Sequence, residues 1–512
     1  MKNNNFYITT PIYYPSGEPH IGHAYSSIIA DVLARFKKND NYNVFFLTGT
    51  DEHGLKIQKA AEKEGLSPID FCNRLSKVFQ NFNEKLNLSN NDFIRTTEKR
   101  HHAAVYELWN RLLSSGDIYL SKYKGWYSIS DEAYYNSKEI DTKGEKKFAI
   151  ESGSEVNWVE EDSYFFKLSS WEGKLLEFYE NNKNFIIPEA RRNEVISFVK
   201  GGLQDLSISR TSFSWGIEVP NKKGHIIYVW LDALTNYLSA LNFPNTNDEL
   251  FKKYWPASLH VIGKDILRFH AVYWPAFLLA ANIKPPKRIF SHGWILSDDK
   301  KMSKSRGNIL NPIEIIKDYG VDQLRYYLMK EVSHGSDGSI SLKNLENCIN
   351  SDLANNYGNL CQRIFSFISN NCNNKVSRTK KLSNSDKSII LETNKLMSDL
   401  RSMMNEQNLN SYIKSVINIS FLTNKYINDE EPWKLKKTNI EKMTNILHIS
   451  LEQIAKISLL LNPIIPTATS KVLDALNIKK ESRKLTFLDG QDIIPNNIVI
   501  NNLTILFNKI TK

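Results

Sequence analysis

The order of apolar and polar positions near the start of the chain predicts alternating strands and helices. Residues 5–14 (NFYITTPIYY) form a run of strand type, and a turn containing proline and glycine follows. Apolar residues then recur at helical spacing, which places them on one face of a helix. These residues are Ile28, Ile29, Val32, Leu33 and Phe36. A second apolar run at 43–49 (NVFFLTG) completes a strand–helix–strand unit, the beginning of a doubly wound α/β domain.

A second α/β stretch comes much later in the chain. It consists of a strand at 259–263, a helix over 265–282 and a strand at 288–292. Between the two stretches, over 116–223, the sequence changes to short aromatic-rich segments in which apolar and polar residues alternate as in strands. Beyond Asp352, runs with helical spacing dominate. We therefore predict an α/β fold with a split, Rossmann-like doubly wound parallel sheet, an inserted β-rich domain and a C-terminal α-helical bundle. The expected ranges are 1–115 and 224–290 for the two halves of the sheet, 116–223 for the insertion, 291–352 for a connecting region and 353–512 for the bundle.

Composition agrees with several domains and narrows the class of protein. A chain of 512 residues is too long for one core, and its net charge of +10 permits a polyanionic partner without showing one. The four cysteines have no C-x-x-C spacing, which excludes a disulfide scaffold and favours buried thiols in a reducing compartment. The N-terminus has no targeting pattern, and the apolar stretch 271–283 is too short to cross a bilayer. We expect a cytoplasmic protein with no membrane partner.

Polar residues at the ends of predicted strands are candidates for chemistry. His20 and His23 flank Gly22 at the first strand-to-helix crossover, where backbone N–H groups favour an anion and imidazoles can donate hydrogen bonds to phosphate. An isolated pair at this spacing is more often a helix cap. Asp51 follows the second strand, where it could hold an ammonium group or belong only to a polar turn. The segment 298–308 (DDKKMSKSRGN), read alone, is a mobile basic loop.

Five motifs together carry a family resemblance. HIGH and KMSKS, one in each half of the predicted sheet, resemble the signature of class I aminoacyl-tRNA synthetases. The motifs TPIYYPSGEPHIGHAY, TGTDEHG, YVWLDA, VIGKDILRFH and SHGWILSDDKKMSKSRGN, in this order, resemble the methionyl-tRNA synthetase family. The resemblance implies an enzyme that joins L-methionine to ATP, releases pyrophosphate and esterifies the 3′ end of methionine tRNA, both initiator and elongator. It also implies a KMSKS loop and stem-contact region within 291–352.

The resemblance also implies roles for individual residues. His20 and His23 would stabilise the α-phosphate, Lys304 would neutralise the pyrophosphate, and Lys301 would assist, with Mg²⁺ bound to the ATP and no general base. Further ATP contacts would come from Gly22, Gly263, Asp265 and Ile295. Asp51 would bind the methionine ammonium group. The side-chain pocket would be lined by Ile12, Tyr14, Trp230, Ala233, Leu234, Tyr237, Ile266 and His270, with hydroxyl or imidazole donors near the sulfur. Asn359, Arg363 and Trp433 match the anticodon readers.

The sequence departs from the family pattern in two places. Many members bind zinc through cysteine knuckles in the inserted domain, but here the corresponding segment has Ser128 and Asp131. No cysteine lies between Cys72 and Cys348, so we expect neither structural zinc nor any other protein-bound metal. The chain ends at Lys512, soon after the bundle, without the appended dimerising domain of some relatives, which leads us to expect a monomer.

Three other functions compete with this one. A small-molecule nucleotidyltransferase shares the HxGH turn, but it would need neither the insertion nor the helical tail. A class I synthetase for isoleucine, leucine or valine shares both signatures, but it would carry a much larger editing insertion than 116–223. A non-catalytic tRNA-binding paralogue is disfavoured because the histidines and lysines of both signatures are present.

Overall fold

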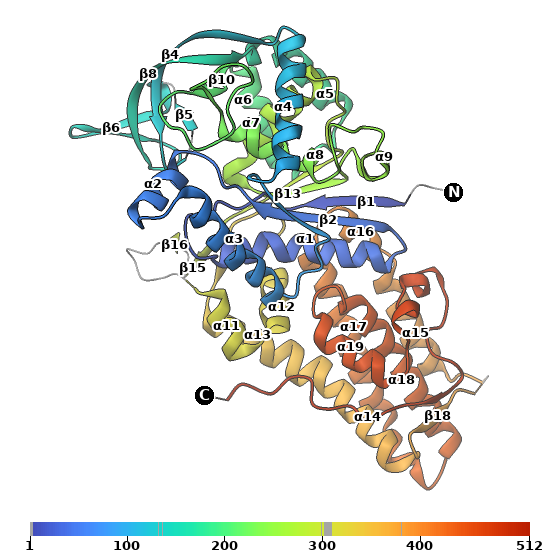
Figure 1. Ribbon diagram of the computed structural model, residues 1–512. Helices are drawn as coiled ribbons and strands as arrows, with labels where there is room; N and C mark the ends of the chain where they lie inside the picture. Colours follow the sequence, from blue (N-terminus) through green and yellow to red (C-terminus); the bar gives the residue numbers. More distant parts are fainter. Residues whose placement is uncertain are drawn as a thin grey trace.

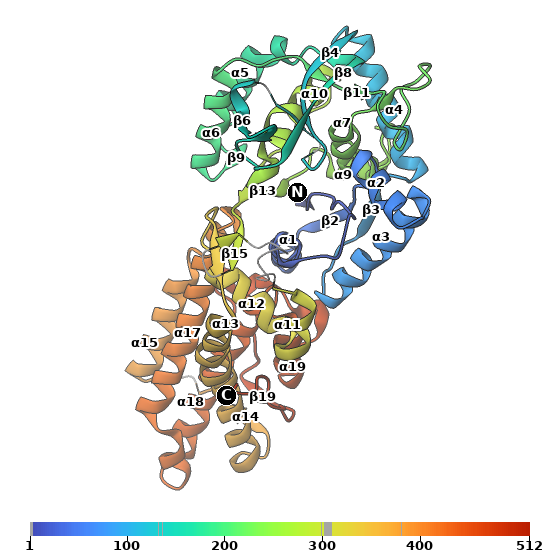
Figure 2. The same cartoon turned by 90° about the vertical axis from the view of Figure 1, so that its left-hand side faces the viewer.

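The structure is a computed structural model that describes residues 4–131, 133–135, 137–297, 300–301, 310–379 and 381–511. A six-stranded parallel sheet lies between the insertion and the helical bundle, which occupy opposite ends of the molecule (Figure 1 and Figure 2). No helix among the described residues is long and apolar enough to cross a membrane.

The parallel sheet joins the two distant α/β stretches at its centre. Its strand order is β3-β2-β1-β13-β14-β9, and β1 pairs with β13 through Ile8 opposite Leu259. The strands are β1 (Asn5–Thr9), β2 (Asn43–Thr50), β3 (Asp92–Arg95), β9 (Ile186–Ile187), β13 (Leu259–Gly263) and β14 (Ile289–His292). Successive side chains of a strand point to opposite faces, so Tyr7 enters the core on the insertion side and Ile8 the core on the bundle side. The predicted split, doubly wound sheet is confirmed.

Helix α1 (Ile21–Asn39) covers the bundle side of this sheet and is buried over most of its surface. One face packs on β1, β2 and β13, and another meets α12 (Val321–Glu331), as Figure 1 shows. Because two layers cover it, α1 carries buried residues around nearly its whole circumference. The helix begins at the carboxyl end of β1, so its N-terminus points to the edge of the sheet where ligands bind in this kind of fold.

The insertion combines an antiparallel sheet with helices. The long strands β4 (Ile118–Ser128) and β8 (Glu155–Phe166) lie at the centre of the order β5-β4-β8-β7-β6. The shorter strands are β5 (Ala133–Tyr135), β6 (Ile140–Lys143), β7 (Lys146–Ala149) and β10 (Leu206–Ser207), the last paired with β8. Helices α5 (Glu172–Asn181) and α6 (Glu189–Lys200) follow. Between them β9 joins the parallel sheet, so this part of the predicted insertion is neither β-rich nor separate from that sheet.

The predicted helix over 265–282 consists of three consecutive helical segments of different pitch. They are a 3₁₀ turn (Lys264–Ile266), a π turn (Phe269–Tyr273) and α10 (Trp274–Ala280). Pro275 has no N–H to donate to the carbonyl of Ala271, and that carbonyl instead accepts the hydroxyl of Tyr179 at 2.6 Å. The proline therefore changes the pitch of the helix and frees an acceptor that fixes the insertion to it.

Other helices of the N-terminal half surround the sheet. They are α2 (Leu55–Lys63), α3 (Pro68–Lys85), α4 (Lys99–Ser114), α7 (Val229–Leu234), α8 (Asn236–Ser239) and α9 (Glu249–Tyr254). Short strands complete this half and the connecting region: β11 (Ser209–Arg210), β12 (Ile226–Ile227), β15 (Ile295–Ser297), β16 (Lys300–Lys301) and β17 (Gly338–Ile340). Helices α11 (Pro312–Tyr319) and α13 (Leu342–Cys348) lie beside α12 and lead into the bundle.

The C-terminal part is the predicted helical bundle. Its helices are a π segment (Ile349–Gly358), α14 (Asn359–Asn371), α15 (Asn384–Met397), α16 (Leu400–Asn405), α17 (Leu409–Glu430), α18 (Ile440–Leu461) and α19 (Pro466–Ala475). A 3₁₀ turn (Pro432–Lys436) joins α17 to α18, and β18 (Lys375–Ser377) pairs with β19 (Asn497–Val499). Helix α18 is its central element, since nearly every residue from Met443 onward is buried. The five predicted domain ranges stay predictions.

A buried ion pair joins α1 to α12, and through it to the bundle. Arg325 and Asp31 are both 0% exposed, and a guanidinium nitrogen of Arg325 lies 2.6 Å from a carboxylate oxygen of Asp31. Arg325 also donates to the carbonyls of Leu86, Pro463 and Ile464, so each of the three guanidinium nitrogens has an acceptor. Burial by itself raises the pKa of Asp31, but the nearby guanidinium groups outweigh it and hold that pKa below its ordinary value.

We predict that Arg325→Met lowers the free energy of unfolding by about 3–5 kcal/mol, because it leaves the buried Asp31 carboxylate without its partner. Urea unfolding followed by circular dichroism measures the change. Arg74→Met is the matched control: Arg74 pairs with Glu64 at the surface, where the two side chains are 51% and 45% exposed. That variant should lose less than about 1 kcal/mol. Equal losses in the two variants would contradict the assigned importance of the buried pair.

Candidate active site

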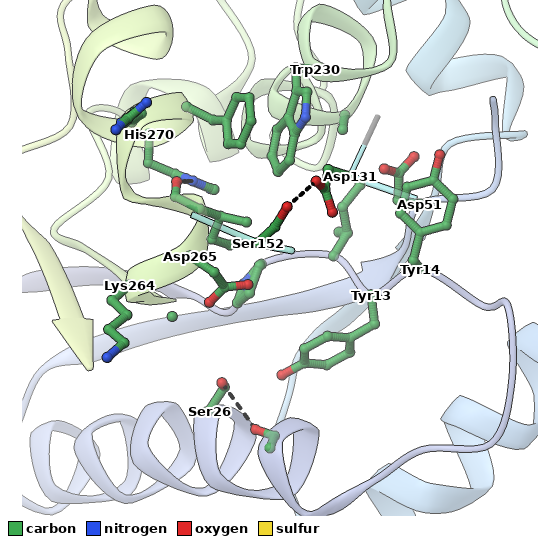
Figure 3. A pocket seen from close by; sticks show the side chains of 18 of the residues that line it. Tyr13, Tyr14, Ser26, Asp51, Asp131, Ser152, Trp230, Lys264, Asp265 and His270 are labelled. Carbon is green, nitrogen blue, oxygen red and sulfur yellow. Dashed lines mark hydrogen bonds between the residues drawn. The ribbon is translucent and has the colours of Figure 1, made fainter. Parts of the chain in front are cut away.

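A cavity of about 630 Å³ opens at the carboxyl ends of the parallel strands. It lies between the start of α1, the segments that follow β1, β2, β13 and β14, and the insertion. Figure 3 shows Tyr14 and Asp51 on one side, with Lys264 and Asp265 on the other. The predicted residues that line it are Ile12, Tyr14, His20, Gly22, His23, Asp51, Trp230, Ala233, Leu234, Tyr237, Gly263, Asp265, Ile266, His270 and Ile295. The structure thus gathers both predicted ligand sets in one cavity.

The two histidines cap α1 with one ring nitrogen each. The N–H of Gly22 donates to Nδ1 of His20 at 3.1 Å, and the N–H of His20 donates to Nδ1 of His23 at 3.2 Å. A ring nitrogen that accepts from an N–H carries no proton, so each neutral imidazole has its proton on Nε2. The rings stack with centroids 3.8 Å apart. The helix-cap interpretation and the phosphate-donor interpretation are therefore compatible, because capping leaves Nε2–H as the free donor.

Burial keeps both imidazoles neutral. It lowers the pKa of His20, against a smaller raising effect of Asp265, and it lowers the pKa of His23 well below the ordinary value, assisted by His20. Gly22 suits the same arrangement, since a Cβ there would stand 3.0 Å from a ring carbon of His20 and crowd that ring. The start of α1 thus offers neutral hydrogen-bond donors beside the positive end of a helix dipole.

The other side of the cavity contains Gly263 and Asp265. A Cβ on Gly263 would lie 2.5 Å from a carboxylate oxygen of Asp265, so the backbone must be bare for this side chain to fold over it. Lys264 pairs with Asp337 at 2.7 Å and lies 4.0 Å from the ring centroid of Trp294. Ile295 is buried at the start of β15. This side combines backbone edges with one carboxylate, a surface that suits a hydroxyl-bearing ring such as a ribose.

The opposite part of the cavity is an aromatic slot in which Tyr237 and His270 are paired with each other, whereas the buried indole Nε1 of Trp230 has no hydrogen-bond partner among the described residues. Trp230 stacks on Phe269 with centroids 3.7 Å apart. Burial lowers the pKa of His270 to about 4, so this imidazole is neutral at pH 7. Its Nδ1 lies 3.0 Å from the carbonyl of Ile266, which fixes the proton there, and its Nε2 accepts from the hydroxyl of Tyr237 at 2.8 Å. The expected donors near a sulfur are therefore used within the protein.

Some cavity residues escaped the sequence analysis. Ser26 lies one turn after His23 on α1, and its hydroxyl is 2.7 Å from Nε2 of His292. Nδ1 of His292 lies 2.8 Å from the carbonyl of Gly293, so Nε2 accepts from Ser26. Both positions had a signal, because Ser26 is at helical spacing from His23 and His292 ends a parallel strand. Lys304 lies outside the described residues, as does the side chain of Lys301.

Comparisons with known proteins decide the family. Residues 6–365 match the model of class I tRNA synthetases (M), and residues 376–512 match the anticodon-binding domain of methionyl tRNA ligase. The chain belongs to the methionyl-tRNA synthetase family. It is 48% identical to the methionine–tRNA ligase of Rickettsia typhi over 100% of both chains, and 47% identical to that of Brucella suis over 94% of each.

Solved structures of the family have the same fold. The methionyl-tRNA synthetase of Mycobacterium tuberculosis in complex with methionyl-adenylate superposes with a TM-score of 0.96 at 44% identity, covering 98% of this chain and 99% of that one. The apo form of the same enzyme superposes with a TM-score of 0.89 at 41% identity, covering 99% of each chain. The fold of these enzymes therefore extends over 98–99% of this chain.

At Asp131, in the segment that the resemblance compares with zinc ligands, the insertion has a carboxylate that accepts from hydroxyls. Asp131 accepts from the hydroxyls of Tyr135 at 2.8 Å, Ser152 at 2.5 Å and Ser154 at 2.7 Å; the Ser152 bond is drawn in Figure 3. Ser128 accepts from the N–H of Asp131. A structural zinc ion takes four ligands among thiolates, imidazoles and carboxylates, so three hydroxyls around a single carboxylate do not fit it. Among the described residues, no three His, Cys, Asp or Glu side chains converge as metal ligands.

The bundle has a second cavity, of about 390 Å³. Its lining residues are Arg363, Ile364, Phe367, Ile427, Pro432, Trp433 and Leu447. The guanidinium of Arg363 lies 5.8 Å from the ring centroid of Trp433 and donates to the side-chain oxygen of Asn428 at 2.8 Å. Trp433 is 41% exposed. Asn359, one turn before Arg363 on α14, is exposed and does not line this cavity, so the structure brings together two of the three predicted anticodon residues.

We predict that His20 and His23 are neutral at pH 7 with the proton on Nε2. The lowered pKa of each means that the unfolded chain binds protons first as pH falls, so these residues titrate below 6.5 and their contribution to stability is lost there. NMR of protein labelled with ¹⁵N-histidine, assigned with His20→Gln and His23→Gln, measures both tautomer and titration. A proton on Nδ1, or imidazolium signals for these two residues at pH 7, would contradict the capping geometry.

Proposed function

We propose that the residues of the larger cavity carry out methionine activation. The chain is a methionine–tRNA ligase, and the proposal concerns which groups perform its first step. A carboxylate oxygen of methionine attacks the α-phosphorus of ATP, the bond from that phosphorus to the bridging oxygen breaks, and pyrophosphate leaves. The observation that supports this assignment is the placement of two Nε2–H donors and a separate aromatic slot within one cavity.

The histidines act on the phosphate without any proton transfer. Nε2–H of His20 and of His23 donate to the oxygens of the α-phosphate, whose negative charge is redistributed as the phosphorus becomes five-coordinate. A neutral donor is suitable here because it needs no counter-ion in the buried site. ATP enters as its Mg²⁺ complex, and Lys304 and Lys301 supply cationic charge at the pyrophosphate. Gly22 and Gly263 leave room for the nucleotide, Asp265 holds the ribose, and Ile295 borders the adenine.

Methionine lies across the cavity with its two ends in different environments. The Asp51 carboxylate, 5% exposed and next to Tyr14, holds the α-ammonium group. The thioether lies in the aromatic slot, lined also by Ile12, Ala233, Leu234 and Ile266. Because the Tyr237 hydroxyl already donates to His270, the sulfur meets apolar walls and the indole N–H of Trp230, which has no partner among the described residues. Such a slot favours a polarizable apolar chain, and it disfavours side chains that need hydrogen-bond partners.

The bundle reads the tRNA anticodon in this proposal. Trp433 offers a stacking surface at the mouth of the smaller cavity, and Arg363 can stack or donate to a base edge. Asn359 would contact a neighbouring base from the exposed surface of α14.

Cytoplasmic location is supported by the free cysteines, three of which are buried. The monomeric state and the use of both initiator and elongator tRNA stay predictions.

We predict that, among the twenty amino acids, methionine gives the strongest exchange of labelled pyrophosphate into ATP. Stronger stimulation by another amino acid would contradict the proposed pocket.

In Asp51→Asn the methionine KM should rise by about tenfold or more, because a hydrogen bond between two charged groups becomes one to a neutral amide. The ATP KM, measured in the same assay, should change by less than about twofold. A matching rise in the ATP KM would mean that Asp51 does not act on the ammonium group.

We also predict that Trp433→Ala lowers kcat/KM for tRNA charging by about tenfold to a hundredfold, because one base loses its stacking partner. Pyrophosphate exchange, which does not use the anticodon, should stay within about twofold of the unsubstituted enzyme. Trp158→Ala is the matched control, since Trp158 is 51% exposed and belongs to the insertion. Equal loss in charging and exchange for Trp433→Ala would show a structural role.

A further inference from the structure

One fully buried carboxylate near the cavity has no part in the mechanism above. Asp232 is 0% exposed and lies on α7 between Trp230 and Ala233, but it does not line the cavity. Its two oxygens accept hydrogen bonds of 2.7 Å, one from Nδ1 of His53 and one from Nε2 of His101. Burying a carboxylate costs free energy even when two imidazoles donate to it, so we expect this arrangement to have a structural or functional role.

The two histidines belong to different elements of the catalytic half. His53 is in the TGTDEHG motif after β2, two residues beyond Asp51, and His101 is in the first turns of α4. His101 is 0% exposed, and its second ring nitrogen lies 2.9 Å from the hydroxyl of Ser239 on α8. Asp232 therefore joins the segment after β2, α4 and α7, while its partner His101 extends the network to α8.

Each side of this network is fixed to a wall of the methionine pocket. The carbonyl of His53 accepts from the hydroxyl of Tyr14 at 2.7 Å, and Tyr14 lines the cavity beside Asp51. On α7, Trp230 and Ala233, two residues before Asp232 and one residue after it, line the opposite wall. The distance between the ammonium-binding side and the side-chain wall is thus set through the Asp232 carboxylate.

We propose that Asp232 is a positioning residue that fixes the width of the methionine pocket by holding His53 and His101. The inference rests on the proposed function of the cavity. It does not extend to the nucleotide side, because none of the bonds of this network reaches His20, Gly263 or Asp265 among the described residues. A substitution that breaks the network should therefore act on methionine and leave ATP binding unchanged.

The electrostatic surroundings agree with an ionised carboxylate. Burial raises the pKa of Asp232, but the hydrogen bonds and charge of His53 and His101 outweigh it, and the net pKa lies well below its ordinary value. Around the pair, the ring of His102 lies 5.6 Å from that of His53 and the indole of Trp215 lies at 5.5 Å. The nearby carboxylate of Glu52 is bound to Arg95 at 2.7 Å, so it does not compete for the histidine protons.

Asp232→Asn tests the proposal in the full chain. The amide has one acceptor oxygen for two ring N–H donors, so one bond is lost. We expect the methionine KM in pyrophosphate exchange to rise about tenfold, as is usual when support of a binding residue is removed, with the ATP KM within about twofold. An unchanged methionine KM, or equal rises for methionine and ATP, would overturn the proposal. If the unsubstituted enzyme showed no methionine-dependent exchange, the proposed function itself would fail.

A pair of substitutions at His101 decides the matter even if Asp232→Asn does not fold. The amide nitrogen of His101→Gln can occupy the position of Nε2 and keep the donor, whereas His101→Leu removes it. We expect a methionine KM close to that of the unsubstituted enzyme for the first variant and about tenfold higher for the second. A packing role alone would make the two alike or favour leucine. His448→Gln, a buried histidine of α18 bound to the carbonyl of Pro495, is the control and should not change the methionine KM.

Discussion

The buried ion pair of Asp31 and Arg325 is the constraint on which the placement of the catalytic half against the helical bundle depends. Asp31 belongs to α1, and besides Arg325 it accepts from Arg35 and from the backbone N–H and hydroxyl of Ser89. Arg325 adds bonds to carbonyls that precede α19 in the bundle. Because these groups have directional acceptors and no access to water, the catalytic half and the bundle can meet in only one register. A purely apolar interface would tolerate sliding.

This register matters for the site because α1 is a single rigid helix. Asp31 lies eight residues after His23, about 12 Å along the helix axis at 1.5 Å per residue. Fixing α1 at Asp31 therefore fixes the direction in which its N-terminus presents the two histidines. The same helix packs on the sheet through Ile28 and its apolar neighbours. Packing on the sheet therefore determines the rotation of α1 about its axis, and the Asp31–Arg325 pair determines its position along that axis. In the proposed mechanism the bundle thus contributes through geometry, at a distance from the phosphate.

The sequence predicted those features that local patterns encode. Helix α1, β1, β2 and β13 followed from apolar periodicity, and the cavity residues followed from strand ends and family motifs. Helices α5 and α6 escaped because their buried positions, such as Leu175 and Tyr179, are few and lie among aromatic residues that suggested strands. Contacts between distant positions could not be read at all. Asp131 meets Ser152 only after the chain folds back, and Tyr237 meets His270 across 33 residues. The directions of these bonds, which decide what each group can still donate, exist only in three dimensions.

Those directions give the cavity its chemical character. Backbone N–H groups occupy Nδ1 of His20 and His23, so Nε2–H is left as the donor that we propose for the phosphate. Tyr237 and His270 satisfy each other, so the slot that they line is mainly apolar, with the indole N–H of Trp230 as an unpaired donor among the described residues. The two regions thus differ in the atoms left unsatisfied, although both contain histidine. In the proposed mechanism this difference separates the nucleotide from the thioether, since an anion gains hydrogen bonds at one end and an uncharged chain loses none at the other.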